Sequence, residues 1–253
     1  MIVSWLVDWY RSRRTGCIPQ GEDERDYEYV LTGANKLPLK IDLRGYFTNP
    51  RSQGNSQSCA GFATSALMEY MLNKEHDFNR RVSSLYLWHN AKKRHGWEKE
   101  NKGVWLRNSL KALFNDGFVM EENFPFDSNY LKQPPFDRLT IMSDVSKFYL
   151  QGTCYYTMGA YSVKDSLSKG RPVIFGLWIN NSFYGNKDGI IKDVKKNRYA
   201  HAMVVVGYDD GRECFIVRNS WGVRWGDGGY CYIPYNYFYE HSFDHWTIDY
   251  KED

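Results

Sequence analysis

Several common functional patterns are missing from this sequence of 253 residues. No two of its five cysteines are separated by only two residues, which excludes zinc-ribbon and thioredoxin-type patterns. No apolar run approaches the length that crosses a bilayer, so we expect no transmembrane segment. No dense block of lysine and arginine alternates with aromatic residues, and the net charge is only +3. We therefore expect no nucleic-acid partner.

The N-terminal stretch "MIVSWLVDWYRSRR" lacks the features of a secretory signal peptide. Its apolar run breaks at Asp8, its positive charge follows that run, and no small-residue cleavage site appears. A short amphipathic helix is the better interpretation, lying on a membrane or, preferably, on the protein's own surface.

The odd number of cysteines leaves at least one thiol unpaired in a monomer. A chain of this length buries enough apolar surface to fold without disulfides, so we expect a reducing, cytoplasmic compartment. Cys214 and Cys231 lie on predicted neighbouring strands and could pair, although two buried free thiols are the favoured interpretation. Cys17 and Cys154 have no chemical context in the sequence.

The composition is that of an ordinary globular protein, with 42% hydrophobic and 25% charged residues. Residues 1 to about 40 mix glycine, proline and charge without periodicity, which indicates an arm before the main domain. Three predicted helices follow: one from Cys59 to about Asn73, one from about Ser84, and one that ends at Gly117.

The pattern changes from helices to strands in the second half of the chain. A short helix ends at Gly170. Apolar runs rich in β-branched or aromatic residues then occupy residues 172–179, 201–208, 213–219 and 229–235. Helices followed by strands predict an α+β fold of two lobes, with a cleft where the lobes meet.

Cys59 lies at the junction between a polar turn and a helix. A sulfur at a helix N-terminus is near unsatisfied N–H groups and the positive end of the helix dipole, which favour the thiolate. By itself this placement is more typical of a structural cysteine. A catalytic interpretation gains support because Gln53 could donate to an oxyanion, His201 could act as a base, and Asn219 could orient its ring.

These residues, in this order, resemble the papain-like cysteine peptidases. The matching pieces are "QG" at Gln53, Cys59 at its helix start, "HAMVVVGY" from His201 and "NSWG" from Asn219. The resemblance runs from "DLR" to "HWTI" and covers roughly residues 40–248.

The resemblance implies a papain-like two-lobe fold, with a helical left lobe whose central helix starts at the catalytic cysteine, and an antiparallel β-barrel-like right lobe. It divides the chain into an arm, residues 1–40, and a peptidase domain, residues 41–253. Within that domain, residues 41–133 are expected to be mainly helical and residues 134–253 mainly β.

The resemblance also implies a role for each site residue. Cys59 attacks the scissile carbonyl, and the Gln53 side chain stabilises the oxyanion together with the Cys59 N–H. His201 transfers the protons, Asn219 holds its ring, and Trp221 shields that hydrogen bond. The substrate would be a peptide or protein, cleaved by an endopeptidase or an exopeptidase, and no cofactor or metal is expected.

Some positions depart from the family pattern. The first cysteine of the family signature, a disulfide partner in secreted members, is Ser56, and the aromatic residue after the nucleophile is Ala60. Only Gly103 is a candidate for the paired glycines that line the substrate cleft. Tyr199, two residues before His201, is assigned by position alone to the pocket for the second residue before the scissile bond.

The style of the sequence is most similar to compact bacterial and viral members of the family. The stretch "GCIPQGEDERDYEY", residues 16–29, resembles their short pro-segment. We expect the arm either to fold across the cleft and inhibit the enzyme, as in a zymogen, or to pack on the back of the protein. As alternatives to a cytoplasmic location, the protein could be a delivered effector or associated with a virion.

Two other functions stay open. The same acyl-enzyme could serve a deamidase, a transglutaminase-like enzyme or a ubiquitin-like-protein peptidase, because the triad does not define the acceptor. A catalytically silent binding module is less consistent with the intact catalytic set. His241 and His245 have a spacing typical of metal ligands but lack a third ligand, so we expect no metal site.

Overall fold

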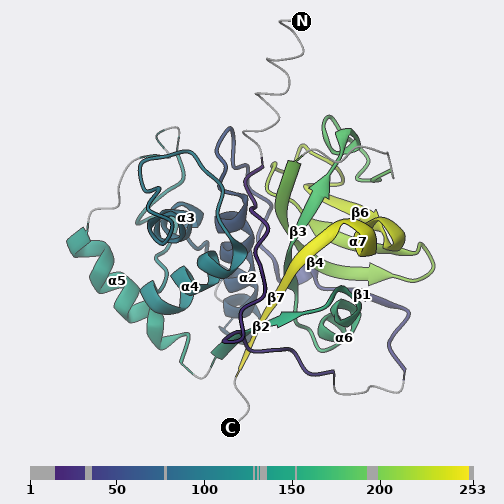
Figure 1. Ribbon diagram of the computed structural model, residues 1–253, viewed down its shortest axis with the longest axis horizontal. Helices are drawn as coiled ribbons and strands as arrows, with labels where there is room; N and C mark the ends of the chain where they lie inside the picture. Colours follow the sequence, from purple (N-terminus) through teal and green to yellow (C-terminus); the bar gives the residue numbers. More distant parts are fainter. Residues whose placement is uncertain are drawn as a thin grey trace, which may run out of the picture.

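The computed structural model describes residues 15–31, 36–76, 79–127, 129, 131, 136–151, 153–192 and 199–250. The N-terminal stretch interpreted above as a short amphipathic helix lies outside these residues. Helices gather on one side and an antiparallel sheet on the other, so the predicted α+β class is confirmed (Figure 1). No helix among the described residues is both long enough and apolar enough to cross a bilayer.

The helical side is built around one nearly enclosed helix. Its members are α2 (Cys59–His76), α3 (Ser84–Lys93), α4 (Leu106–Asp116) and α5 (Phe136–Phe148). Side chains are buried around most of the circumference of α2, as expected for a helix packed on several sides. Gly61 allows α3 to approach closely, because a Cβ at that position would lie 2.6 Å from the Ser84 carbonyl oxygen. The catalytic candidate at the start of α2 is therefore held by a rigid element.

The other side is a seven-stranded sheet in which every pairing is antiparallel. Its strands run in the spatial order β2-β7-β3-β4-β5-β6, and β1 also pairs with β4. Their bounds are β1 (Lys40–Asp42), β2 (Thr153–Met158), β3 (Val173–Ile179), β4 (Tyr199–Asp209), β5 (Cys214–Arg218), β6 (Tyr230–Pro234) and β7 (Ser242–Tyr250). Two short helices, α6 (Val163–Ser168) and α7 (Tyr235–His241), complete this side.

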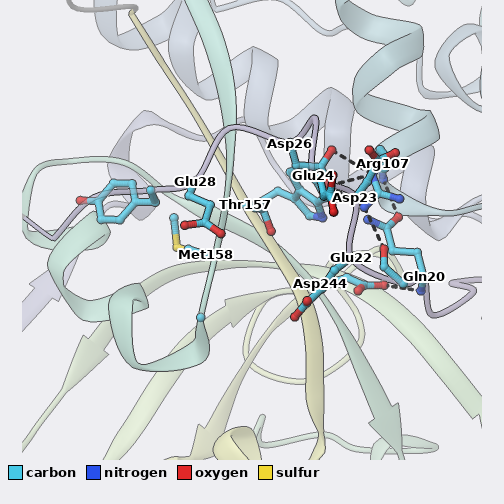
Figure 2. A pocket seen from close by; sticks show the side chains of 14 residues that line it. Gln20, Glu22, Asp23, Glu24, Asp26, Glu28, Arg107, Thr157, Met158 and Asp244 are labelled. Atoms are coloured by element: carbon cyan, nitrogen blue, oxygen red, sulfur yellow. Dashed lines mark hydrogen bonds and ion pairs between the residues drawn. The ribbon is translucent and has the colours of Figure 1, made fainter.

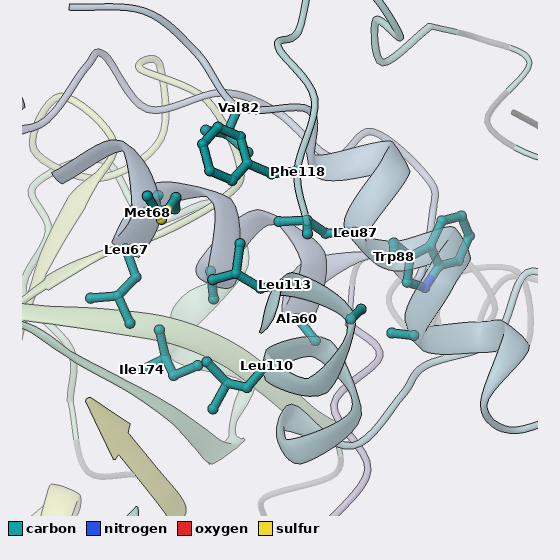
Figure 3. Packing of buried hydrophobic residues seen from close by; sticks show 14 of the residues in the cluster. Ala60, Leu67, Met68, Val82, Leu87, Trp88, Leu110, Leu113, Phe118 and Ile174 are labelled. Carbon is teal, nitrogen blue, oxygen red and sulfur yellow. The ribbon is translucent and has the colours of Figure 1, made fainter. Parts of the chain in front are cut away.

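The central strand β4 separates two hydrophobic cores. Ala202, Val204 and Val206 belong to the core that contains α2, α3 and α4. Met203 and Val205 belong to the second core, together with residues of α6 and α7. This alternation follows from the two-residue period of a strand, and it explains why β4 is apolar on both faces. Figure 3 shows the first core, where α2, α3 and α4 bring together Leu67, Trp88 and Leu110.

Several elements differ from the sequence-based expectations. Strand β1 falls in the range expected to be mainly helical but pairs with β4, so the main sheet includes a strand from before the helices. Helix α5 falls in the range expected to be mainly β. Elements β2 and α7 were not anticipated, and β7 extends well beyond the short "HWTI" match. The predicted strands at 201–208 and 213–219 correspond to β4 and β5.

Candidate active site

Cys59 is the first residue of α2 and is completely buried. Its Sγ accepts a hydrogen bond from the backbone N–H of Ala202, at 3.4 Å, so the helix start lies directly against β4. The two lobes therefore meet at this sulfur.

Burial raises the pKa of the Cys59 thiol to about 12. The backbone N–H groups of Ala202, Ala60 and Cys59 itself lower that pKa in part, because they hydrogen-bond the sulfur. Helix-start amides thus favour the thiolate, as the sequence suggested, but desolvation outweighs them. In this arrangement burial favours the protonated thiol over the thiolate.

His201 and Asn219 meet beside this sulfur. His201 lies on β4 immediately before Ala202, and its Nε2 is 2.8 Å from the Oδ1 of Asn219, the residue after β5. Because a carbonyl oxygen only accepts, Nε2 carries the proton in this pair. The Trp221 ring lies over His201, with ring centroids 5.0 Å apart, and all three side chains are buried. Trp221 therefore packs against the ring that makes this hydrogen bond.

Gln53 is completely buried and its side chain is fixed at both ends. Its Oε1 accepts from the Ser220 hydroxyl at 2.6 Å, and its Nε2 donates to the Ser56 carbonyl at 2.7 Å. The Gln53 backbone N–H also donates to the Ser220 carbonyl at 2.9 Å. An amide nitrogen has two hydrogens, so Nε2 retains one hydrogen besides the bond to Ser56. Ser220, next to Asn219, therefore joins the two polar parts of the site.

Hydrogen bonds hold the loop before Cys59 in place of a disulfide, since all five cysteines are free. The Ser56 hydroxyl donates to the Gln53 carbonyl at 2.7 Å. Gln57 donates its backbone N–H to Asn101 Oδ1 at 2.8 Å, and its Oε1 accepts from the Gly103 N–H at 3.0 Å. Asn101 Nδ2 completes the link by donating to the Asn55 carbonyl at 3.2 Å.

The N-terminal arm passes between the lobes at this point (Figure 1). The backbone N–H groups of Gly16 and Cys17 donate to the Ala200 carbonyl at 3.2 and 3.3 Å. On the helical side, Val104 donates to the Gly16 carbonyl at 3.0 Å and accepts from the Ile18 N–H at 3.2 Å. Residues 16–18 therefore bridge both walls of the cleft, one residue from His201.

The backbone fits the arm closely at two glycines. A Cβ on Gly103 would lie 2.0 Å from the Gly16 carbonyl oxygen, and Gly16 itself has a φ of +136°. Gly103 therefore lies against the arm, but its N–H donates to Gln57, and Val104 forms the main-chain pairing with the arm.

Cys17 is buried in the same cluster as Cys59. Its pKa is raised, mainly by burial and further by the neighbouring charge that a Cys59 thiolate would carry. Burial therefore disfavours the thiolate of both residues in this arrangement.

Beyond Ile18 the arm covers a cavity of about 570 Å³ (Figure 2). Arm residues from Gln20 onward line it, together with Arg107, Asp244 and Trp246 of the domain. Tyr199, which the family resemblance assigned to a substrate pocket, does not line this cavity; its ring contacts Tyr184 instead. No sequence motif indicated Arg107 or Asp244, because each becomes recognisable only through its contact with the arm.

His241 and His245, whose spacing is typical of metal ligands, contact neighbouring protein side chains. His245 is buried, and its Nε2 lies 2.8 Å from the Ser242 hydroxyl. Desolvation lowers the pKa of His245 to about 4. No group of three potential metal-binding side chains occurs within the described parts of the chain.

Comparison with known proteins identifies similar chains. The sequence model described as papain family cysteine protease matches residues 37–243. An uncharacterised peptidase C1-like protein of Acanthamoeba polyphaga mimivirus is 26% identical, over 94% of this chain and 87% of its own length. A cathepsin L-like proteinase of Fasciola hepatica is 29% identical, over 79% of this chain and 61% of its own length.

Solved structures agree with these sequence matches. Xylellain, a cysteine protease from Xylella fastidiosa, superposes with a TM-score of 0.86 and 27% identity, covering 95% of this chain and 97% of its own. Digestive procathepsin L 3 of Tenebrio molitor has a TM-score of 0.72 at 21% identity, covering 96% and 78%. The second similarity supports the fold alone.

Proposed function

The chain belongs to the papain family of cysteine proteases, and on that premise we propose that Cys59, His201 and Asn219 form its catalytic triad. One observation carries the proposal: the Cys59 sulfur accepts from the N–H of the residue after His201, whose ring is bonded to Asn219. A nucleophile, a base and an orienting group in this order are what thiol acyl transfer requires.

The proposed reaction has two steps. His201 takes the proton from Cys59, and the thiolate attacks the scissile carbonyl carbon to form a C–S bond. His201 then protonates the amine as the C–N bond breaks, which leaves a thioester on Cys59. In the second step His201 deprotonates a water that attacks the thioester, and the sulfur leaves as thiolate.

The negative charge on the carbonyl oxygen would be stabilised by Gln53 and the Cys59 N–H. The hydrogen bonds that Gln53 donates to Ser56 and accepts from Ser220 support this role, because they fix the amide before substrate arrives. Preorganised donors of this kind reduce activation barriers because they need no rearrangement during the reaction.

We also propose that the arm inhibits the enzyme in the form described here. Residues 16–18 bond to Val104 on one wall and Ala200 on the other, which leaves no room for a substrate backbone at the same positions. Cys59 is completely buried while the arm is docked, and this burial raises the pKa of its thiol. Withdrawal of the arm would expose the sulfur and lower its pKa towards the range of a reactive thiolate.

The arm is anchored along its length. Asp26 forms a buried ion pair with Arg107. Tyr29 donates its backbone N–H to the Thr157 carbonyl at 2.8 Å, and its hydroxyl donates to Asp165 at 2.7 Å. The backbone bond from Tyr29 to Thr157 adds a short piece of arm to the edge of the sheet at β2. Together with the side-chain contacts, it supports a stable closed state.

Peptide hydrolysis by the full chain, before and after the arm is loosened by Asp26→Asn, tests the proposed function. Asp26→Asn should raise the rate, and adding Cys59→Ala should abolish it. Hydrolysis that survives Cys59→Ala would overturn the assignment of the nucleophile.

A further inference from the structure

Arg107 occupies an unusual position for a residue in the first turn of a helix. Its side chain is only 9% exposed, and the side chain of its partner Asp26 is only 7% exposed. Its Nε donates to both Asp26 carboxylate oxygens at 3.0 Å, and its Nη2 donates to Asp26 at 2.5 Å and to the Gly21 carbonyl at 2.8 Å. Figure 2 shows this cluster at the side of the cavity.

The partners of the Arg107 guanidinium in these bonds all come from the arm. The Arg107 backbone N–H also donates to the arm, to Gln20 Oε1 at 3.0 Å. On the domain side the guanidinium lies near the Trp246 ring, 5.7 Å from its centroid. Departure of the arm would therefore leave a planar cation, backed by an aromatic ring, without its carboxylate.

We propose that Arg107 is a specificity-determining residue that binds an acidic side chain of the polypeptide substrate, an inference that rests on the proposed function. A desolvated guanidinium is stabilised best by a bidentate carboxylate, which is the group that Asp26 supplies in the closed form. Substrate and arm would thus compete for the same cation.

The position of the subsite follows from the arm. Gly21, whose carbonyl accepts from the Arg107 guanidinium, is four residues after Cys17, the arm residue that bonds beside His201. Four residues of extended chain span about 13 Å. The acidic side chain should therefore lie about three or four residues from the scissile bond, on the side of the cleft formed by α4, β2 and β7.

Asp244 is the competing anion in the cavity. It accepts from the Gln20 N–H at 2.9 Å, and Arg107 lies close enough to affect its ionisation. If Asp244 neutralised Arg107 once the arm left, the open enzyme would show no preference for acidic residues. In the experiment below, the absence of an acidic preference in Asp26→Asn would be the result of such neutralisation.

Cleavage-site profiling with a peptide library tests the proposal in the full chain. Asp26→Asn and the double variant Asp26→Asn/Arg107→Gln both lack the ion pair, and because they open to different extents, the rates for acidic and amide peptides are compared within each variant. They differ in the cation alone. In Asp26→Asn, peptides with Asp or Glu three or four residues from the scissile bond should be cleaved at least about tenfold faster than peptides with Asn or Gln there. Asp26→Asn/Arg107→Lys, which keeps the charge, should retain part of that preference.

The outcomes distinguish the two proposals. Loss of the acidic preference in the Arg107→Gln double variant, with other positions of the profile unchanged, supports the inference. An equal preference in both variants, or none in Asp26→Asn, contradicts it while leaving the peptidase assignment intact. No cleavage by any variant would instead contradict the proposed function on which the inference rests.

Discussion

Replacing Asp26 by asparagine should open the arm in a measurable way. The substitution removes one charge from an ion pair whose side chains are 9% and 7% exposed, and so leaves Arg107 buried without its counter-ion. Breaking a buried pair in this manner costs about 3–5 kcal/mol. Asparagine can still accept one hydrogen bond, so we take the lower value. Since about 1.4 kcal/mol corresponds to a factor of ten, the open fraction should rise about 100-fold.

The rate of Cys59 alkylation by iodoacetamide measures the open fraction. The Cys59 sulfur is completely buried in the closed form, so it reacts only through opening, and at low reagent concentration the rate follows the open population. Peptide mapping by mass spectrometry assigns the label to Cys59 rather than to the other four thiols, which are also buried.

Asp23→Asn is the matched control. Asp23 belongs to the same acidic stretch of the arm but pairs with Arg25, which is 83% exposed. Exposed pairs contribute little to stability, so this variant should change the alkylation rate by no more than about threefold. Equal rates for the wild type and Asp26→Asn would refute the reasoning, because they would mean that the buried ion pair does not hold the arm closed.

Two further predictions concern the oxyanion donor and a buried histidine. In the Asp26→Asn background, Gln53→Ala should lower kcat for peptide hydrolysis about 10²- to 10³-fold with a smaller change in KM; an unaltered kcat would exclude the oxyanion role. His245 has a folded pKa of about 4 against an ordinary 6.5, so the unfolded chain binds the proton more tightly. Its contribution to stability is complete above pH 6.5 and should fall by about 3 kcal/mol as the pH drops to 4. Urea unfolding of the wild type and His245→Gln between pH 7 and 4.5 measures this loss, and parallel curves would contradict it.

The sequence was most informative where local signals and tertiary structure agree. The polar turn before Cys59 and the apolar periodicity after it predicted the start of α2, and the Val-rich run after His201 predicted β4. Both elements are buried, so their patterns are strong. The motif order predicted one site for Cys59, His201 and Asn219; the Cys59 sulfur accepts from the residue after His201, and the His201 ring bonds Asn219.

Elements with conflicting local signals were not predictable. Helix α7 has the sequence "YNYFYEH", whose aromatic residues favour strands, and it forms because Tyr237 and Phe238 pack in the second core. Helix α5 follows two prolines and shows no clear amphipathic pattern. Secondary-structure preference is a weak guide where packing determines the outcome.

The roles of Arg107 and of the Cys59 environment depend on contacts between distant segments. Arg107 has the sequence context of an exposed helix residue, and its carboxylate partner Asp26 lies 81 positions away in the arm. The helix start at Cys59 indicated a low thiol pKa, whereas desolvation in the closed form raises it to about 12. Local sequence reports neither effect, because both depend on contacts between segments that are far apart in the chain.

The central claim is that Cys59 forms a thioester with the acyl part of the substrate. Intact-mass spectrometry of the Asp26→Asn protein, quenched in acid shortly after mixing with a peptide ester, tests it directly. The account predicts one acyl group per chain, mapped to Cys59, and none in Asp26→Asn/Cys59→Ala. An acyl group on another residue, or hydrolysis without any adduct that continues after Cys59→Ala, would contradict it.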